Sequence, residues 1–334
     1  MKVFYSLEEA SAGLSSGVIS SASGIARPAS VLTWGNFDGV HLGHQSLLRA
    51  LVAKAKNLGL PSVVMTFTPR PAVFFNAGYA PKAIADLDDK LALLEKCGVD
   101  YTLVLPFTSE IASLAPVEFL EKLALYGLGA KALVLGYDVA FGRGREGNFD
   151  FLNERRHKYG FELDQVPPYY LGERAVSSTW IREELAQGSL DSLPALLGRQ
   201  HSVHGTVQPG YQRGRSVLGF ATANLDPGPL LLPPNGVYAC LARCDGAYYA
   251  AATNLGFNPS FGGDKISLEA HILDFSGEIY GKDLRLYFIE RLRGEKTFSS
   301  PDELGLQITK DVQRTRDVIG EVLSTPDFSA RYPL

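Results

Sequence analysis

The feature that most limits the possible folds is an alternation, in the first half of the chain, of short apolar runs with stretches of helical periodicity. Strands that are apolar on both faces and separated by helices indicate a parallel sheet covered on both sides. We therefore predict an α/β domain there, with ligands bound beyond the carboxyl ends of the strands. The predicted strands are residues 31–34, 62–67, 101–105 and 131–135, and the predicted helices are residues 43–57, 86–97, 117–125 and 151–159.

The pattern changes after about residue 187, near Gln187-Gly-Ser189. Beyond this point, short strands with Gly and Pro between them, and no intervening helices, indicate an antiparallel barrel or sandwich. A final helix is predicted to begin at Ser300-Pro-Asp-Glu303, which has the spacing of a capping box with Pro at the first helical position. We therefore predict two domains, residues 1–187 and 188–334, the second mainly β with a C-terminal helix. Its predicted strands are residues 202–207, 237–243, 248–253, 267–273 and 284–292.

Bulk composition excludes several classes of protein. A net charge of −4 over 334 residues leaves no overall basic surface for nucleic acid. The three cysteines, Cys97, Cys240 and Cys244, are too sparse for a disulfide framework and indicate a reducing compartment, so we expect a cytoplasmic protein. Residues 1–10 lack the apolar run of a signal peptide, and no stretch of 18 apolar residues occurs, so we expect no membrane partner.

After the first predicted strand lies the segment Gly35-Asn-Phe-Asp-Gly-Val-His-Leu-Gly-His-Gln45. Glycines let the backbone approach a ligand closely, and the start of the following helix offers unpaired N–H groups suited to phosphate. His41 and His44 share one face of a helical turn, where their ring N–H groups can bind phosphate oxygens. Two alternatives stay open at this point: solvated or capping histidines at a helix start and, with less support, a zinc site.

This string resembles a known signature. His41-x-Gly-His44 after a strand is similar to the motif of nucleotidyltransferases that move AMP or CMP from a triphosphate. The longer string resembles the adenylyltransferase module of bacterial bifunctional riboflavin kinase/FAD synthetases, and segments 66–71, 136–147 and 176–182 support that branch. The resemblance implies a Rossmann-like nucleotidyltransferase fold. It implies that His41, His44 and Arg182 are catalytic and that ATP or its phosphates are bound by Gly35, Phe37, Asp38, Gly39, Gly43, Gly136, Asp138, Ser178 and Thr179.

The sequence departs from the family pattern on the flavin side of this site. Tyr137 and Val139-Ala140 replace the more usual acidic and aromatic–basic residues, and Arg70 stands where His is common. These changes leave the phosphate residues in place. For the phosphate residues the alternatives are local: N-capping by Ser178 and Thr179, a surface charge at Arg182, and a capped turn at Asp138.

Residues 205–224 resemble the riboflavin kinase domain of the same enzymes, and this resemblance implies a six-stranded antiparallel barrel with a C-terminal helix. In an extended Thr222-Ala-Asn224 segment, the alternate hydroxyl and amide groups face the same way and suit a hard cation such as Mg²⁺. Ala221 stands where the family usually has Pro, which relaxes the backbone but removes no ligand. The resemblance implies that Gly210, Arg213, Gly214 and Gly219 bind the nucleotide and that Asn254 and Asn258 bind the flavin.

Glu269 corresponds to the glutamate assigned as catalytic base in this family. Leu268, Ala270 and Ile272 alternate with Glu269 and His271, so in a strand the apolar side chains face the core and the two polar side chains face the other way. A carboxylate there can deprotonate a primary hydroxyl for attack on a γ-phosphate. An isolated Glu in a strand is more often a surface charge, and it is the resemblance that favours the catalytic role.

Together the two resemblances imply a bifunctional enzyme. Its C-terminal domain would phosphorylate riboflavin to FMN, and its N-terminal domain would adenylylate FMN to FAD, with ATP as co-substrate and Mg²⁺ as the metal. We expect a monomer or a weak homo-oligomer. Two rivals stay open: an enzyme with another small phosphorylated acceptor, and a flavin-binding protein without catalytic activity.

Overall fold

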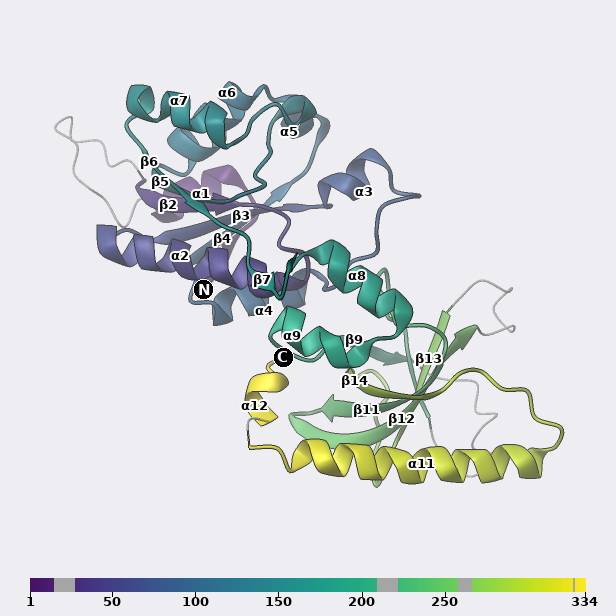
Figure 1. Cartoon of the computed structure of the whole chain (residues 1–334). Coiled ribbons are helices and arrows are strands. Elements are labelled where there is room, and N and C mark those ends of the chain that lie inside the picture. Colours follow the sequence, from purple (N-terminus) through teal and green to yellow (C-terminus); the bar gives the residue numbers. More distant parts are fainter. Residues whose placement is uncertain (15–27, 209–221, 258–265, 327) are drawn as a thin grey trace. The chain divides into compact units, whose positions relative to one another are not determined.

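A computed structural model describes residues 1–14, 28–208, 222–257, 266–326 and 328–334 (Figure 1). The chain divides into two compact units. Unit 1 comprises residues 1–82 and 86–176, and unit 2 comprises residues 83–85 and 177–334. The predicted domain boundary after residue 187 places helix α8 (Ser178–Gln187) in the first catalytic domain, whereas the division into compact units places α8 in unit 2. The assignment of α8 to the first catalytic domain stays a prediction.

Unit 1 is built on a six-stranded sheet in the order β1-β4-β3-β2-β5-β6, in which all neighbouring strands are parallel. The four predicted apolar strands are confirmed, and the two edge strands are additional. β1 is only three residues long, and β6 is partly exposed, so neither carries a continuous apolar run. The strands are β1 (Lys2–Phe4), β2 (Ser30–Trp34), β3 (Ser62–Thr68), β4 (Tyr101–Pro106), β5 (Ala130–Gly136) and β6 (Glu162–Val166).

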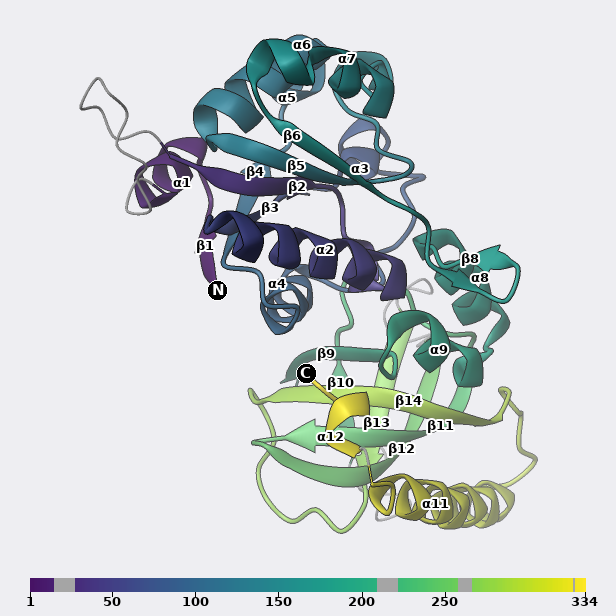
Figure 2. The same ribbon diagram turned by 60° about the vertical axis from the view of Figure 1, so that its left-hand side comes forward.

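Helices cover both faces of this sheet (Figures 1 and 2). On one face lie α2 (Leu42–Leu58) and α4 (Leu87–Lys96). On the other lie α1 (Leu7–Leu14), α6 (Pro116–Glu118), which continues into the π-helix η3 (Phe119–Gly127), and α7 (Phe149–Tyr159). Alternate strand residues such as Leu32, Trp34 and Met65 pack with the second set of helices in one buried cluster. The remaining elements of unit 1 are η2 (Asp38–Val40), α3 (Pro71–Phe75), α5 (Ser109–Ser113), η4 (Arg143–Arg145), β7 (Tyr170–Leu171) and β8 (Arg174–Ala175).

The strand order reverses direction at β2. From β2 the chain adds β3 and then β4 on one side, and it returns to add β5 and then β6 on the other. The carboxyl ends of β2 and β5 therefore flank the switch point, where open α/β sheets bind their ligands. The segments that follow these two strands are the ones predicted to bind nucleotide, residues 35–44 and 136–147.

Unit 2 is a closed antiparallel barrel in the order β10-β13-β12-β11-β14-β9, with β9 pairing β10 to close the ring. The barrel form is therefore confirmed over the sandwich. The strands are β9 (Ser202–Gln208), β10 (Ala223–Leu225), β11 (Gly236–Cys244), β12 (Ala247–Phe257), β13 (Ile266–Ile272) and β14 (Asp283–Arg293). The helices of unit 2 are α8, η5 (Leu190–Ser192), α9 (Leu193–Leu197), α11 (Pro301–Leu323) and α12 (Phe328–Arg331).

The C-terminal helix α11 begins as predicted. The Ser300 hydroxyl accepts a hydrogen bond from the backbone N of Glu303 at 3.2 Å, and Pro301 is the first helical residue. The Glu303 carboxylate accepts from the backbone N of Ser299 at 3.0 Å, so the return bond of the predicted capping box is displaced by one residue. Val318 and Ile319 then pack against Tyr287 of the barrel.

Among the described residues, no helix combines the length and the apolar character needed to cross a membrane. The three cysteines are free thiols, and Cys240 and Cys244 are buried on β11.

Candidate active sites

The histidine segment begins with an unusual backbone. Phe37 (φ 47°), Gly39 (φ 76°) and Val40 (φ 40°) all lie in the left-handed region, which a β-branched residue such as Val rarely adopts. The tight turn buries Asp38 and then His41, which are only 4% and 6% exposed. Because α2 starts at Leu42, His41 directly precedes the helix and His44 lies in its first turn, so both histidines are at the helix N-terminus that follows β2.

His41 is the N-cap of α2. Its Nδ1 accepts a hydrogen bond from the backbone N of His44 at 3.3 Å, so a neutral His41 carries its proton on Nε2. The predicted alternative of a capping histidine is thus realised for His41. This capping bond uses one of the two ring nitrogens of His41.

The two imidazoles lie face to face. Their ring centroids are 3.6 Å apart at an interplanar angle of 19°. Burial lowers the pKa of His44 well below its usual value, and the nearby His41 and Lys90 lower that pKa further. His44 Nδ1 is buried and has no hydrogen-bond partner among the described residues. Without an anion, the His44 ring is therefore held in its uncharged form.

A side chain at Gly43, between the two histidines, would be crowded. A Cβ at this position would lie 3.1 Å from the His41 ring and 3.1 Å from the carbonyl oxygen of Val176. The sequence predicts a glycine here for close approach of a ligand. The structure adds a reason internal to the protein, since a larger residue would require the His41 ring or this carbonyl to give way by a few tenths of an ångström.

Asp38 is held by Arg70, which stands at the N-cap position of α3. Arg70 Nη1 lies 3.0 Å from Asp38 Oδ2, and Arg70 Nη2 donates to the carbonyl of Pro81 at 2.6 Å. The departure from the family pattern at Arg70 therefore places a guanidinium against the histidine turn.

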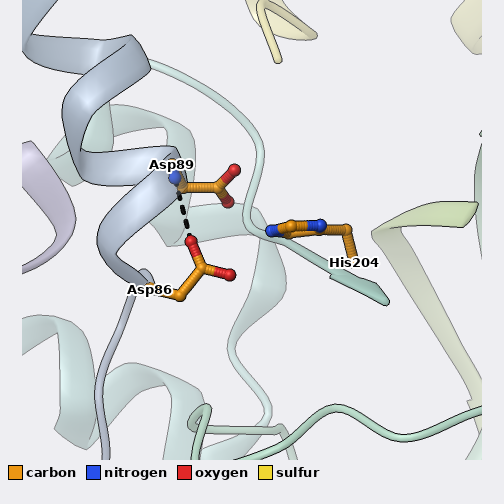
Figure 3. Close-up of side chains that lie close together, drawn as sticks. All are labelled: Asp86, Asp89 and His204. Carbon is orange, nitrogen blue, oxygen red and sulfur yellow. Dashed lines mark hydrogen bonds between the residues drawn. The ribbon is translucent and has the colours of Figure 1, made fainter. Parts of the chain in front are cut away.

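Lys90 belongs to the same neighbourhood, and the sequence analysis missed it. It lies on α4, whose N-cap Asp86 accepts from the backbone N of Asp89 at 2.9 Å (Figure 3). Lys90 is only 4% exposed, and burial lowers its pKa to about 8. The sequence did contain a sign of this burial, because Lys90 lies three and four residues before Leu93 and Leu94 and therefore shares their buried face of α4.

The second predicted nucleotide segment follows β5. Gly136 ends that strand, Tyr137 and Asp138 form an exposed turn, and Val139 and Ala140 are partly buried. The segment thus lies at the switch point of the sheet, as expected of a ligand loop. The Asp138 carboxylate packs against Gly136, since a Cβ on this glycine would lie 3.3 Å from Asp138 Oδ1.

The third predicted segment opens α8 in unit 2. The cap is Ser177, whose Oγ accepts from the backbone N of Trp180 at 3.3 Å. Ser178 and Thr179 therefore occupy the first turn, where backbone N–H groups have no helical acceptor, and the capping alternative for these two residues is wrong. Arg182 lies one turn further along and is partly buried.

The barrel brings the predicted kinase residues together by strand register. Asn224 on β10 is directly opposite Glu269 on β13, and Glu269 is directly opposite Asn254 on β12. Side chains directly opposite one another on neighbouring strands are in contact distance on the same face. The three residues therefore form a row across the barrel wall. Thr222, two residues before Asn224, is partly buried like Asn224.

Glu269 has the environment predicted for it. Leu268, Ala270 and Ile272 are buried, and Glu269 lies on the alternate, partly buried face. Ser267, which shares that face, donates its hydroxyl hydrogen bond to Glu269 Oε1 at 2.9 Å. Ser267 is a second residue that the sequence analysis missed, and it orients the carboxylate.

Some predicted site residues fall outside the part of the chain that the structure describes. They are Gly210, Arg213, Gly214, Gly219 and Asn258, together with Ala221.

Comparison with known proteins gives matches in both units. A family model of FAD synthetase matches residues 25–180, and one of riboflavin kinase matches residues 197–319. A bifunctional riboflavin kinase/FMN adenylyltransferase of Escherichia coli (strain K12) is 36% identical over 291 residues, covering 87% of this chain and 93% of that protein. Its counterpart in Haemophilus influenzae is 38% identical, covering 85% of this chain and 92% of that protein. A crystal structure described as a macrolide-efflux protein from Streptococcus pneumoniae is 32% identical with a TM-score of 0.78, covering 89% of this chain and 97% of that one.

Proposed function

We propose roles for individual residues in both halves of this chain, which belongs to the bifunctional riboflavin kinase/FMN adenylyltransferase family. The C-terminal half phosphorylates riboflavin to FMN, and the N-terminal half adenylylates FMN to FAD with release of pyrophosphate. The matches over both halves support this assignment, whereas the roles of individual residues are our proposal.

In the kinase half, Glu269 is the general base. Its carboxylate takes the proton of the 5′-hydroxyl of the ribityl chain as that oxygen forms a bond to the γ-phosphorus of ATP, and the bond between this phosphorus and the β,γ-bridging oxygen breaks to release ADP. The hydrogen bond from Ser267 aims one carboxylate oxygen and leaves the other for the substrate. Asn254 binds the flavin substrate beside the base, a role that its register directly opposite Glu269 supports.

The donor set next to Glu269 fits Mg²⁺. The Thr222 hydroxyl and the Asn224 amide oxygen are hard oxygen ligands of the kind that Mg²⁺ prefers. Thr222 directly precedes β10, and Asn224 lies within β10, the strand that pairs with β13. Mg²⁺ held there with ATP would neutralise charge on the phosphates. Asn224 and Glu269 are adjacent in the row, so the metal-binding and proton-accepting groups are held by one set of backbone hydrogen bonds.

In the adenylyltransferase half, no protein nucleophile is required. An oxygen of the FMN phosphate forms a bond to the α-phosphorus of ATP, and the bond from that phosphorus to the α,β-bridging oxygen breaks to release pyrophosphate. His41 and His44 donate hydrogen bonds to the polyphosphate as its charge increases. The first turn of α8, with Ser178 and Thr179, and the guanidinium of Arg182 are further phosphate ligands.

We also propose the setting in which this enzyme works. The three free thiols support a reducing, cytoplasmic compartment. The net charge of −4 supports small-molecule substrates without nucleic acid or membrane partners. We propose a monomer or weak homo-oligomer, which sedimentation analysis over a range of concentrations will test.

The observation that carries the residue assignments in the kinase is the register Asn224–Glu269–Asn254. The experiment that tests the whole proposal follows purified protein with riboflavin, ATP and Mg²⁺ by chromatography over time. FMN appearing first and FAD after it is the expected result. FMN alone would point to another acceptor at the N-terminal site, and flavin binding without either product would support the non-catalytic alternative.

A further inference from the structure

Lys90 is the one cation in unit 1 that combines deep burial with a place beside the histidine pair, among the residues that the structure describes. Lysine is rarely buried without a partner, because removing an ammonium from water costs several kcal/mol. Lys90 is 4% exposed, and burial is the main reason that its pKa falls to about 8. Lys90 lies outside the sequence segments discussed above as the basis of the family resemblance.

The groups around Lys90 come from several elements of unit 1. Asp38 of the histidine turn raises the pKa of Lys90, and Arg70 before α3 lowers it. The charge of Lys90 lowers the pKa of His44 on α2. Asp89, the neighbour of Lys90 on α4, is also buried. Lys90 is therefore coupled to the ion pair that holds the turn and to one of the two imidazoles.

We propose that Lys90 is a positioning residue for adenylyl transfer, whose buried ammonium, next to the Asp38–Arg70 ion pair, holds the turn before α2 in the shape that presents His41 and His44 to a polyphosphate. The inference rests on the proposed role of these histidines. The turn contains the left-handed Phe37 and Val40, which are conformations that relax unless neighbouring groups fix them. The ion pair of Arg70 with the buried Asp38, together with the buried charge of Lys90 that interacts with the same carboxylate, is such a constraint.

The same ammonium sets the charge of the site before substrate arrives. A positive neighbour and burial favour the uncharged form of His44, so the ring enters the reaction as a neutral donor.

The test is the variant Lys90→Met, which keeps the length of the side chain and removes its charge. In this variant the buried Asp38 carboxylate keeps its bond to Arg70 and is not left uncompensated, so the melting temperature should stay close to that of wild type. We expect kcat for FAD formation from FMN and ATP to fall on the order of tenfold or more. Lys90→Arg should recover part of this loss, and riboflavin phosphorylation by the same sample should be unchanged.

Lys96→Met is the matched control, since Lys96 lies on the exposed side of the same helix. The second readout is the histidine titration followed by NMR in the absence of substrate. In Lys90→Met the His44 resonance should titrate at higher pH than in wild type, which loosened packing alone would not predict for a helix that still melts normally.

Wild-type FAD formation together with an unchanged His44 titration would overturn the proposal. A large drop in melting temperature with loss of both activities would also overturn it, by showing a general structural role. The proposed role of the histidines can fail independently of this inference. If His44→Ala retains FAD formation while Lys90→Met still shifts the His44 titration, then Lys90 and His44 interact but adenylyl transfer does not depend on that interaction.

Discussion

Replacement of His44 by alanine tests the adenylyltransferase site most directly. The ring is a hydrogen-bond donor to the leaving polyphosphate, and loss of one such donor typically costs about 2.7–4 kcal/mol of transition-state stabilisation, or 10²–10³ in kcat. Burial and the neighbouring His41 and Lys90 keep the pKa of His44 low, so the variant removes a neutral donor rather than a cation. We therefore expect the lower end of that range, a loss of about 10² in kcat for FAD formation.

The ring also packs, which requires a control for shape. His44 stacks on His41 at 3.6 Å and lies 5.2 Å from the Phe37 ring, so alanine leaves space beside both. His44→Asn retains a side-chain donor and should recover part of the activity. His157→Ala changes an exposed histidine on α7 and should leave both activities unchanged.

The assay supplies FMN and ATP for one reaction and riboflavin and ATP for the other, on the same sample. FAD formation is expected to fall while riboflavin phosphorylation stays within about twofold of wild type, because His44 and Glu269 belong to different compact units. FAD formation within a factor of three of wild type would refute the donor role of His44. Equal loss of both activities would refute the separation of the sites.

Three further predictions follow from the contacts described above. Glu269→Gln should reduce riboflavin phosphorylation by about 10²–10⁴, the usual range for a general base, and leave adenylylation of supplied FMN intact; intact phosphorylation would rule out Glu269 as the base. Because the pKa of His44 is lower in the folded protein than the ordinary value of 6.5, the unfolded chain binds more protons in that window, so folding stability should fall as the pH decreases below about 6.5. Urea unfolding at several pH values should show a smaller fall for His44→Asn, and identical pH slopes would contradict the lowered pKa. Ser300→Ala removes the N-cap of α11 and should cost about 1 kcal/mol of unfolding free energy, measured by urea denaturation; no change would mean that the cap bond is replaced by solvent.

Much of the fold was predictable because it is encoded locally. The central strands of unit 1 are buried on both faces, and burial leaves a continuous apolar run such as Val63, Val64 and Met65. β10 was expected only as an extended segment at Thr222–Asn224 and not as a strand of the barrel, because three residues carry no periodicity. The barrel was expected in outline, and its closure depends on β9 pairing with β10 across segments that no local pattern connects.

The sites divide in the same way. His41 and His44 were predictable because they lie close together in the sequence, and Glu269 was identified through a motif. The juxtaposition of Asn224, Glu269 and Asn254 is a matter of long-range strand register, which single residues do not encode. Lys90 and Arg70 reach the histidine turn only through tertiary packing, so their contribution required the structure.

The row across the barrel wall determines which changes in chain length this enzyme tolerates. Side chains alternate between the two faces of a strand, so deletion of one residue within β13 ahead of Glu269 would exchange the carboxylate with the buried side of the wall. A closed ring offers no edge at which the slip relaxes, because β13 is hydrogen-bonded on both sides. Insertions and deletions are therefore confined to the connections, such as residues 226–235 and 274–282, where a change of length leaves the pairing of the strands unaltered. We therefore expect relatives of this chain to differ in length at these connections and not within the strands of the barrel.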